Sequence, residues 1–356
     1  MLQIDTAQLG SGGLVDYRHV VRLLFSALFA VLTFTISPVV SAQGKNAAQE
    51  SDPVLTRLKC DTVDKSSVAM SFEGLSIVDG DSDVQYSKIQ LLGKSPSCNR
   101  RSLSAAGGKS VFGVPKIEYE GGVNSERFAK VIPEPGNTDN HVLQFWLQSP
   151  NVRSPQGVPA KGRVQMDLYN NRNLRQVHYS VRMFLTKSFA LLKDYPSDID
   201  WMTVSEWWDN PAWGGGKYPF RISVNITKPD ASAKSLYFAV RAQTMDKVVK
   251  HKGMEDVWFS VNKDFEIPTE KWMTLDYYWV EGDDKTGQFK MTVTPEDGAT
   301  KTLFAETNFT HHPADPAPIG LTHLNLLKLY TSRQVIDYVK SRGDALSVYW
   351  DDLQIQ

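Results

Sequence analysis

Short segments in which apolar and polar residues alternate recur from about residue 128 to the C-terminus, and they constrain the fold more than any other feature. The segment VHYSVRMFL at 177–185 shows the pattern clearly. Similar segments lie at 142–148, 163–169, 220–226, 237–243, 272–280, 287–295 and 346–355. A period of two residues, interrupted by Gly, Pro, Asn and Asp, is typical of antiparallel strands with one face buried and one in water.

This many strands exceed a small sandwich, so the sequence predicts an all-β fold, a two-sheet antiparallel jelly-roll sandwich. The segments 189–195 and 333–341 predict two short helices. Residues 93–125 are rich in Gly, Ser and Lys and predict loops. Because no fixed-period repeat and no Pro/Ser linker follows residue 125, we expect a single jelly-roll domain over residues 67–356.

The N-terminus predicts a signal peptide over residues 1–42, followed by a mobile leader over residues 43–66. Arg18 and Arg22 precede the apolar run 23–36, and small residues end at Ala42, where a signal peptidase would cut. The alternative is an uncleaved membrane anchor, but the apolar run is shorter than the roughly 20 residues that a bilayer span needs. We therefore expect a secreted or periplasmic protein with no stable membrane span after cleavage.

Composition excludes several classes of function. A formal net charge of −1 argues against a broad nucleic-acid footprint, which needs a strong basic excess. The two cysteines, Cys60 and Cys98, predict one disulfide in an exported protein and argue against structural zinc. The aspartates in VDGDSDV at 78–84 fit an acidic turn better than a calcium loop, because the EF-hand glycine and final glutamate are missing. We expect no metal, no cofactor and a monomer.

The stretch from Trp201 to Asn225 gathers the residue types that bind sugars. It holds four of the nine tryptophans and a carboxylate, Glu206, between them. Strict alternation predicts that Met202, Val204, Glu206 and Trp208 share one strand face, with Trp207 in the core. The alternative is a buried aromatic core beside a loop.

The outward strand faces carry Arg, Gln, His, Asn, Trp and Tyr where a merely solvated face would carry Thr, Ser, Lys and Glu. Arginine binds planar carboxylates through paired donors, and tryptophan supports a sugar ring. We therefore predict a concave groove whose substrate-binding residues are Trp146, Asp167, Arg182, Trp208, Trp213, Arg221, Asn225, Arg241 and Gln243.

The order of these segments resembles the concanavalin A-like jelly rolls. The resemblance rests on the runs FAKVIPEPGNTDNHVLQF, GRVQMDLY, HYSVRMFLTKSFALL, WMTVSEWW, FRISVNI, LLKLYTS and LSVYWDDLQI. That superfamily includes legume-type lectins, laminarinase-type glycoside hydrolases and polysaccharide lyases of the alginate and heparin lyase type. The lyases are nearest in pattern. The resemblance covers roughly residues 70–356.

The resemblance also implies site residues. Arg163 matches the first arginine of the R-S-E-L-R motif of alginate-lyase-type members, with Gln165 where the glutamate stands. Glu206 lies where those enzymes carry Gln-Ile-His, and Lys328 and Tyr330 lie in the strand similar to Y-F-K-A-G-x-Y. We take Arg163, Gln165, Glu206, Tyr330, Lys328 and His178 as the candidate catalytic residues.

Three functions remain open from the sequence. A lyase acting on a uronic-acid polymer would neutralise the carboxylate with arginine and move protons through Tyr330 or His178. A glycoside hydrolase would use Glu206 as general acid, its pKa raised by the tryptophans, with Asp167 or Asp209 as partner. A lectin-like protein would bind the glycan without cleaving it. The recurrence of Arg and Gln favours a polysaccharide lyase acting by β-elimination.

Overall fold

The computed structural model describes residues 59–61, 68–72, 87–90, 115–154, 157–209, 216–245 and 254–355. All of them belong to one compact unit of the chain. The predicted signal peptide, the acidic turn, Cys98 and Trp213 lie outside these residues, as does the side chain of Cys60, so the disulfide remains a prediction.

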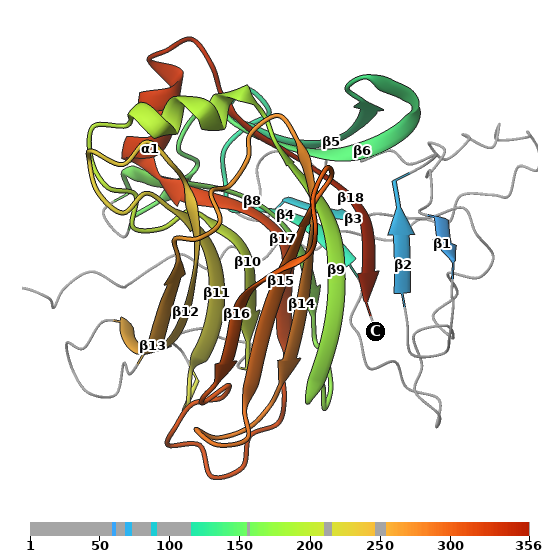
Figure 1. Cartoon of the computed structure of the whole chain (residues 1–356), viewed down its shortest axis with the longest axis vertical. Helices are drawn as coiled ribbons and strands as arrows, with labels where there is room; N and C mark the ends of the chain where they lie inside the picture. The colour runs from blue at the N-terminus through green and yellow to red at the C-terminus, as the bar shows by residue number, and fades with distance from the viewer. Residues whose placement is uncertain are drawn as a thin grey trace, which may run out of the picture. The chain divides into compact units, whose positions relative to one another are not determined.

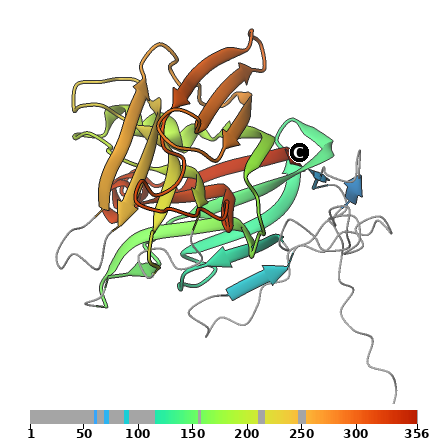
Figure 2. The ribbon, with the colours of Figure 1, turned by 90° about the horizontal axis from the view of Figure 1, so that it is seen from below.

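Two antiparallel sheets, each of nine strands among the described residues, face each other (Figure 1). The first sheet has the order β1-β2-β18-β9-β14-β15-β16, with β6 paired to β18 and β5 paired to β6. Its strands are β1 (Lys59–Asp61), β2 (Val68–Ser71), β5 (Arg127–Glu134), β6 (Asn137–Leu147), β9 (Gln176–Leu185), β14 (Trp272–Val280), β15 (Gln288–Pro295), β16 (Lys301–Thr307) and β18 (Leu346–Ile355). The end of β18, marked C in Figures 1 and 2, lies beside β2 and β9.

The second sheet has the order β13-β12-β11-β10-β17-β8-β4-β3, with β7 paired to β8. Its strands are β3 (Ser87–Gln90), β4 (Pro115–Tyr119), β7 (Val152–Arg153), β8 (Pro159–Tyr169), β10 (Thr203–Trp208), β11 (Phe220–Thr227), β12 (Tyr237–Met245), β13 (Met254–Asn262) and β17 (His323–Ser332). The two sheets fit a concanavalin A-like jelly roll, so the predicted all-β fold class is confirmed.

Two short helices lie together at one end of the sheets (Figure 1). They are the 3-10 helix η1 (Lys187–Asp194) and the α-helix α1 (Arg333–Lys340), and both match predicted segments. The side chain of Ser332 accepts a hydrogen bond from Val335 N and so caps α1. None of the helices in the described part of the chain is long and apolar enough to cross a membrane.

Two strands form where the sequence predicted a leader and loops. Lys59–Asp61 pairs with β2, and Pro115–Tyr119 pairs with β8. Ile117 and Tyr119 of β4 are buried in the core, so alternation was present there but too short to be recognised.

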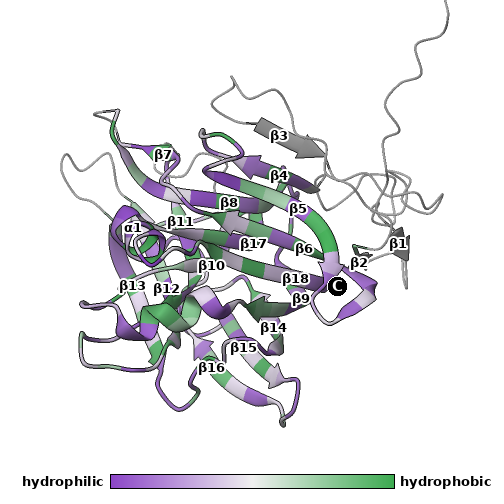
Figure 3. Ribbon diagram, turned by 90° about the horizontal axis from the view of Figure 1, so that it is seen from above, coloured by the Kyte–Doolittle hydropathy of each residue, from purple (hydrophilic) through white to green (hydrophobic). Residues whose placement is uncertain are grey.

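The core between the sheets is made by the apolar strand faces, which appear as alternating bands in Figure 3. Trp207 on the second sheet joins the two layers: its ring centroid lies 5.8 Å from that of Tyr179, 5.3 Å from Tyr277 and 5.5 Å from Phe289, all on the first sheet. Trp207 is therefore a core residue, as alternation from Glu206 predicted.

Replacing Trp207 with alanine should remove this bridge and leave a cavity between the sheets. We expect the free energy of unfolding to fall by about 3–5 kcal/mol, measured by urea denaturation. The exposed Ile319 offers a control, because Ile319→Ala should change stability by less than about 0.5 kcal/mol. A loss of similar size in both variants would contradict the assignment of Trp207 to the core.

Candidate active site on the second sheet

Polar side chains of five adjacent strands share the outer face of the second sheet, which we call the polar face. Residues directly opposite each other in a sheet lie on the same face, and the register therefore groups them. The polar face comprises Arg163, Gln165, Asp167 and Tyr169 of β8, His323, Asn325, Lys328 and Tyr330 of β17, Thr203, Glu206 and Trp208 of β10, Arg221, Ser223 and Asn225 of β11, and Arg241 and Gln243 of β12.

Most of the residues predicted from the sequence lie together on this face. They are Arg163, Gln165, Asp167, Glu206, Trp208, Arg221, Asn225, Arg241, Gln243, Lys328 and Tyr330. Their functional roles remain predictions.

Three predicted residues, Trp146, His178 and Arg182, lie on the outer face of the first sheet instead. Trp146 stacks on Phe128 with ring centroids 4.7 Å apart, and His178 Nε2 lies 2.8 Å from Asp276 Oδ2 beside a cavity of about 590 Å³. Alternation places each of them outward correctly, but period two does not tell which sheet a strand joins. They are therefore separated from the polar face by the core.

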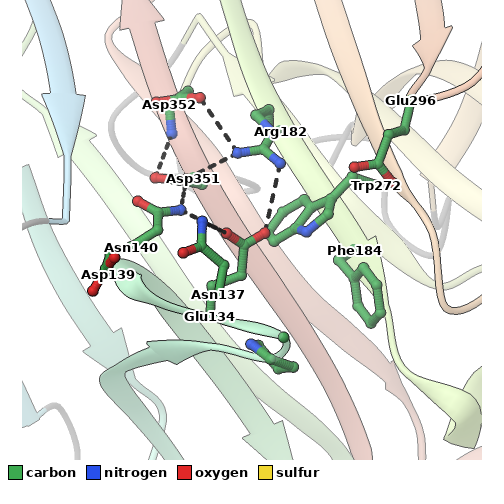
Figure 4. A pocket seen from close by; sticks show the side chains of 12 residues that line it. Glu134, Asn137, Asp139, Asn140, Arg182, Phe184, Trp272, Glu296, Asp351 and Asp352 are labelled. Carbon is green, nitrogen blue, oxygen red and sulfur yellow. Dashed lines mark hydrogen bonds and ion pairs between the residues drawn. The ribbon is translucent and has the colours of Figure 1, made fainter.

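Arg182 lines a second cavity on the first sheet, of about 660 Å³ (Figure 4). Its guanidinium lies 3.2 Å from Asp351 Oδ2, 3.6 Å from Asp352 Oδ2 and 3.6 Å from Glu134 Oε1. Figure 4 shows these carboxylates converging on it. Arg182 is thus neutralised within its own cavity and is not a carboxylate receptor of the polar face.

A β-bulge in β17 brings Asn325 to the polar face. The pairing with β8 shifts between Asn325 and Leu327, so Asn325 and Lys328 both point outward although they are three residues apart. Strict alternation from Lys328 predicts that Leu326, and not Asn325, shares its outward face. For this reason Asn325 was not predicted from the sequence.

A second irregularity, in β10, corrects the predicted faces of the stretch before Glu206. The register shifts between Thr203 and Glu206, so Thr203 pairs with Tyr330 and Asn225 on the polar face, while Met202 and Val204 lie in the core. The prediction that Met202 and Val204 share the face of Glu206 is wrong, because one extra residue reverses the alternation. Trp201 instead contacts Tyr330.

Glu206 lies at the centre of the polar face and is almost completely buried. Its Oε1 accepts a hydrogen bond from Arg221 Nη1 at 2.6 Å, and its Oε2 forms an ion pair with Lys328 Nζ. Burial raises the pKa of Glu206, but the positive charges of Lys328 and Arg221 outweigh burial and hold the pKa at about 2. Glu206 is therefore ionised at neutral pH, opposite to the general acid expected from neighbouring tryptophans.

The pKa of Asp167 is displaced in the opposite direction from that of Glu206. Burial raises its pKa well above the usual range, and the nearby Glu118 raises it further. Gln165 Nε2 donates to Asp167 Oδ2 at 3.2 Å, and Asn325 Nδ2 donates to its other oxygen. Asp167 and Glu206, which both pair with Asn325 in the sheet register, are thus two carboxyl groups on one face whose pKa values are displaced in opposite directions.

Asp209, the other predicted partner for Glu206, follows β10 directly. Burial raises its pKa to about 8. Its Oδ1 accepts a hydrogen bond from Phe220 N at 2.9 Å, so it joins the ends of β10 and β11. This arrangement gives Asp209 a structural role.

Tyr330 is the partly exposed centre of a cationic cluster. Arg163 Cζ and Lys328 Nζ each lie 5.2 Å from its ring centroid, and Lys161 Nζ lies 5.6 Å away. The ring of Trp201 packs on the same phenol with centroids 5.0 Å apart. Among the described residues, no side chain forms a hydrogen bond with the Tyr330 hydroxyl. We call Tyr330, Trp201, Lys161, Arg163 and Lys328 the Tyr330 cluster.

Two buried polar atoms beside Tyr330 lack hydrogen-bond partners within the described structure: Arg163 Nε and Gln165 Oε1. Buried polar groups are usually paired, because an unmet hydrogen bond costs about 1–3 kcal/mol. Nη2 of the same guanidinium forms an ion pair with Glu120. One donor and one acceptor, two residues apart on β8, are thus left unpaired, and both atoms are shielded from solvent.

The β11–β12 side of the polar face is satisfied internally. Arg221 donates to Gln243 Oε1 at 2.8 and 3.1 Å, and Arg241 pairs with Asp200 at 2.9 Å. Asn225 Oδ1 accepts a hydrogen bond from Thr203 Oγ1 at 2.9 Å. These side chains support the face, and the groups available to a ligand lie on its β8–β17 side.

His323 was not predicted from the sequence but also lies on this face. Its ring packs against Tyr169 with centroids 4.2 Å apart and stacks on Trp208 at 5.8 Å. Burial lowers the pKa of His323 to about 4, so it is neutral at physiological pH. No group of three His, Cys, Asp or Glu side chains in the described ranges converges as metal ligands do.

No known protein family matches the sequence, and no curated protein matches it either. Among solved structures, the chain is similar to an endo-β-1,4-glucuronan lyase from Trichoderma reesei, with 14% identity over 64% of this chain and 86% of that chain and a TM-score of 0.38. It is also similar to a marine PL-14 alginate lyase from Aplysia kurodai, with 9% identity, the same coverage and a TM-score of 0.38. A glycoside hydrolase family 131 catalytic domain from Coprinopsis cinerea has 8% identity over 74% and 89% of the chains and a TM-score of 0.33. The assignment of a site rests on the geometry of the polar face.

The Glu206 network predicts a pH-dependent stability. Because the folded-state pKa of Glu206 is about 2, below its ordinary value of 4.5, ionisation of Glu206 stabilises the fold above pH 4.5 and this contribution disappears as the pH falls toward 2. Glu206→Gln should lower the free energy of unfolding at pH 7 by about 3 kcal/mol. Urea denaturation should show that the difference from wild type narrows between pH 4.5 and 2.

The control is Glu270→Gln at an exposed glutamate, which should leave stability unchanged at every pH. A difference between wild type and Glu206→Gln that stays constant from pH 7 to pH 2 would mean that the carboxylate charge does not stabilise the sheet.

Proposed function

We propose that the protein is a polysaccharide lyase that cleaves an acidic, uronic-acid glycan by β-elimination on the polar face. The observation that carries the proposal is the Tyr330 cluster: a partly exposed phenol among three cations, one of them the partly exposed Arg163. The predicted signal peptide supports an exported enzyme acting on extracellular polymer.

The chemistry assigns one task to each group. The guanidinium of Arg163, whose side chain is 14% exposed, binds the uronate carboxylate and so stabilises the charge that develops when the proton on C5 is removed. The Tyr330 oxygen, as phenolate, takes that proton, and its electron pair forms the C4–C5 double bond as the C4–O bond breaks. Tyr330 returns the proton to the leaving oxygen, which restores the phenolate.

Lys328 supplies fixed positive charge beneath the phenol. Its ammonium is held by Glu206 and by Asn325 Oδ1 at 3.2 Å. Burial lowers the pKa of Lys328, and the carboxylate of Glu206 opposes this effect. Glu206 therefore acts as a positioning residue in the proposed enzyme. Groups held in place before the reaction cost no reorganisation when charge develops.

A glycoside hydrolase is the second candidate, and one observation favours it. Asp167 and Glu206 have pKa values displaced in opposite directions, which is the pattern of a general acid beside an ionised carboxylate. Both carboxyl groups, however, are at most 1% exposed. A general acid must reach the glycosidic oxygen, so we rank this function below the lyase.

The products distinguish these functions. Incubated with a panel of acidic and neutral polysaccharides, a lyase produces an unsaturated uronate that absorbs in the ultraviolet together with new reducing ends. A hydrolase produces reducing ends without that absorbance. We expect ultraviolet-absorbing products from a polyuronate. Binding in a glycan gel without cleavage would instead identify a lectin-like protein.

Tyr330→Phe removes the hydroxyl and keeps the ring that packs on Trp201. If Tyr330 transfers the proton, kcat on the polyuronate should fall by about 10²–10⁴-fold, with a much smaller change in KM. The matched control is Tyr278→Phe on the outer face of the first sheet, which should keep wild-type kinetics. Full activity in Tyr330→Phe would exclude Tyr330 as the proton carrier.

A further inference from the structure

Trp201 and Lys161 are the two members of the Tyr330 cluster to which the proposed elimination assigns no task. Trp201 lies two residues before the start of β10, is partly exposed, and meets the Tyr330 ring at 51° with centroids 5.0 Å apart. Lys161 lies on β8, two residues before Arg163, and its side chain is exposed. Its ammonium lies 5.6 Å from the ring centroids of both Trp201 and Tyr330.

Lys161 lacks the carboxylate partner that each arginine of the polar face has. Arg163 pairs with Glu120, Arg221 with Glu206, and Arg241 with Asp200. Lys161 forms no ion pair with any described carboxylate. Asp200, next to Trp201 in the chain, is already bound to Arg241. Lys161 is therefore the exposed cation of the Tyr330 cluster that has no described carboxylate partner.

We propose that Trp201 and Lys161 form a subsite for a second uronate, adjacent to the sugar that reacts at Tyr330. This inference rests on the proposed function and specifies it further. The indole gives a flat platform for a sugar ring, and the ammonium pairs with the carboxylate of the same sugar. Because the two aromatic rings are in contact, neighbouring sugars of one chain reach both. The subsite selects polymers with consecutive uronates over those with isolated ones.

The direction of the substrate follows from the same residues. Lys161, Arg163 and Gln165 project from alternate positions of one strand, and Trp201 and Tyr330 lie beside them. On the opposite side, Arg241 is covered by its ion pairs with Asp200 and Asp256. The glycan therefore extends from Tyr330 toward the start of β8, and not toward β12 and β13.

The test measures binding apart from turnover. In a Tyr330→Phe background, short uronate oligosaccharides and their carboxyl-reduced counterparts are titrated by calorimetry. Lys161→Ala should weaken binding of the uronate oligosaccharides about fivefold and leave the reduced ones unaffected. Trp201→Ala should weaken binding of both about tenfold, and Trp201→Phe should restore most of it. With Tyr330 intact, both alanine variants should raise KM on the polymer and leave kcat nearly unchanged.

Lys130→Ala is the matched control, because Lys130 lies 4.4 Å from the Phe128 ring on the outer face of the first sheet. It should bind as the Tyr330→Phe parent does, and thermal melting checks that every variant is folded. If Lys161→Ala and both Trp201 variants bind like the parent, or if the parent binds no uronate oligosaccharide, the subsite is overturned. If wild type cleaves nothing but binding depends on Lys161 and Trp201, the subsite stands and the lyase proposal fails.

Discussion

The buried charge of Glu206 is the interaction on which the polar face depends. Glu206 lies on β10, and its two oxygens are bound by Arg221 on β11 and Lys328 on β17, so one carboxylate joins three adjacent strands. The side chains of Glu206 and Lys328 are each 1% exposed, and a buried charge without its partner costs several kcal/mol. The three residues must therefore be in place together, and their placement fixes the cation beneath Tyr330.

Alternation in the sequence predicted the fold class, the inward and outward faces of most strands, and much of the polar face. Period two places Arg163, Gln165 and Asp167 on one side of β8 and separates core Trp207 from Trp208. These predictions succeed because they depend only on the chain's local geometry. Which strands share a sheet depends on contacts between segments far apart in the sequence, and alternation does not report those contacts. For that reason the sequence prediction grouped His178, Trp146 and Arg182 with residues of the other sheet.

The two β-bulges are a second feature that the sequence did not predict. One extra residue in β17 turns Asn325 outward, and an irregularity in β10 turns Thr203 outward and Val204 inward. No residue type at these positions announces a bulge. The direction of the pKa shift of Glu206 could not be predicted from the sequence either. It depends on whether burial, which raises the pKa, or the two cations on neighbouring strands, which lower it, have the larger effect. The electrostatics of the site therefore follow from strand order, which only the three-dimensional structure supplies.

Internal charge pairing decides where a ligand can bind on this face. Arg221 on β11 and Arg241 on β12 each have a carboxylate partner, so an incoming polyanion gains little net attraction there and would have to displace those partners. A preorganised network of this kind holds donors in fixed directions, which favours binding a developing charge over attracting a distant one. Ligand attraction then falls to the exposed Lys161 and the partly exposed guanidinium of Arg163, and both project from β8 beside Tyr330. β8 therefore supplies the cations on which the proposed chemistry depends.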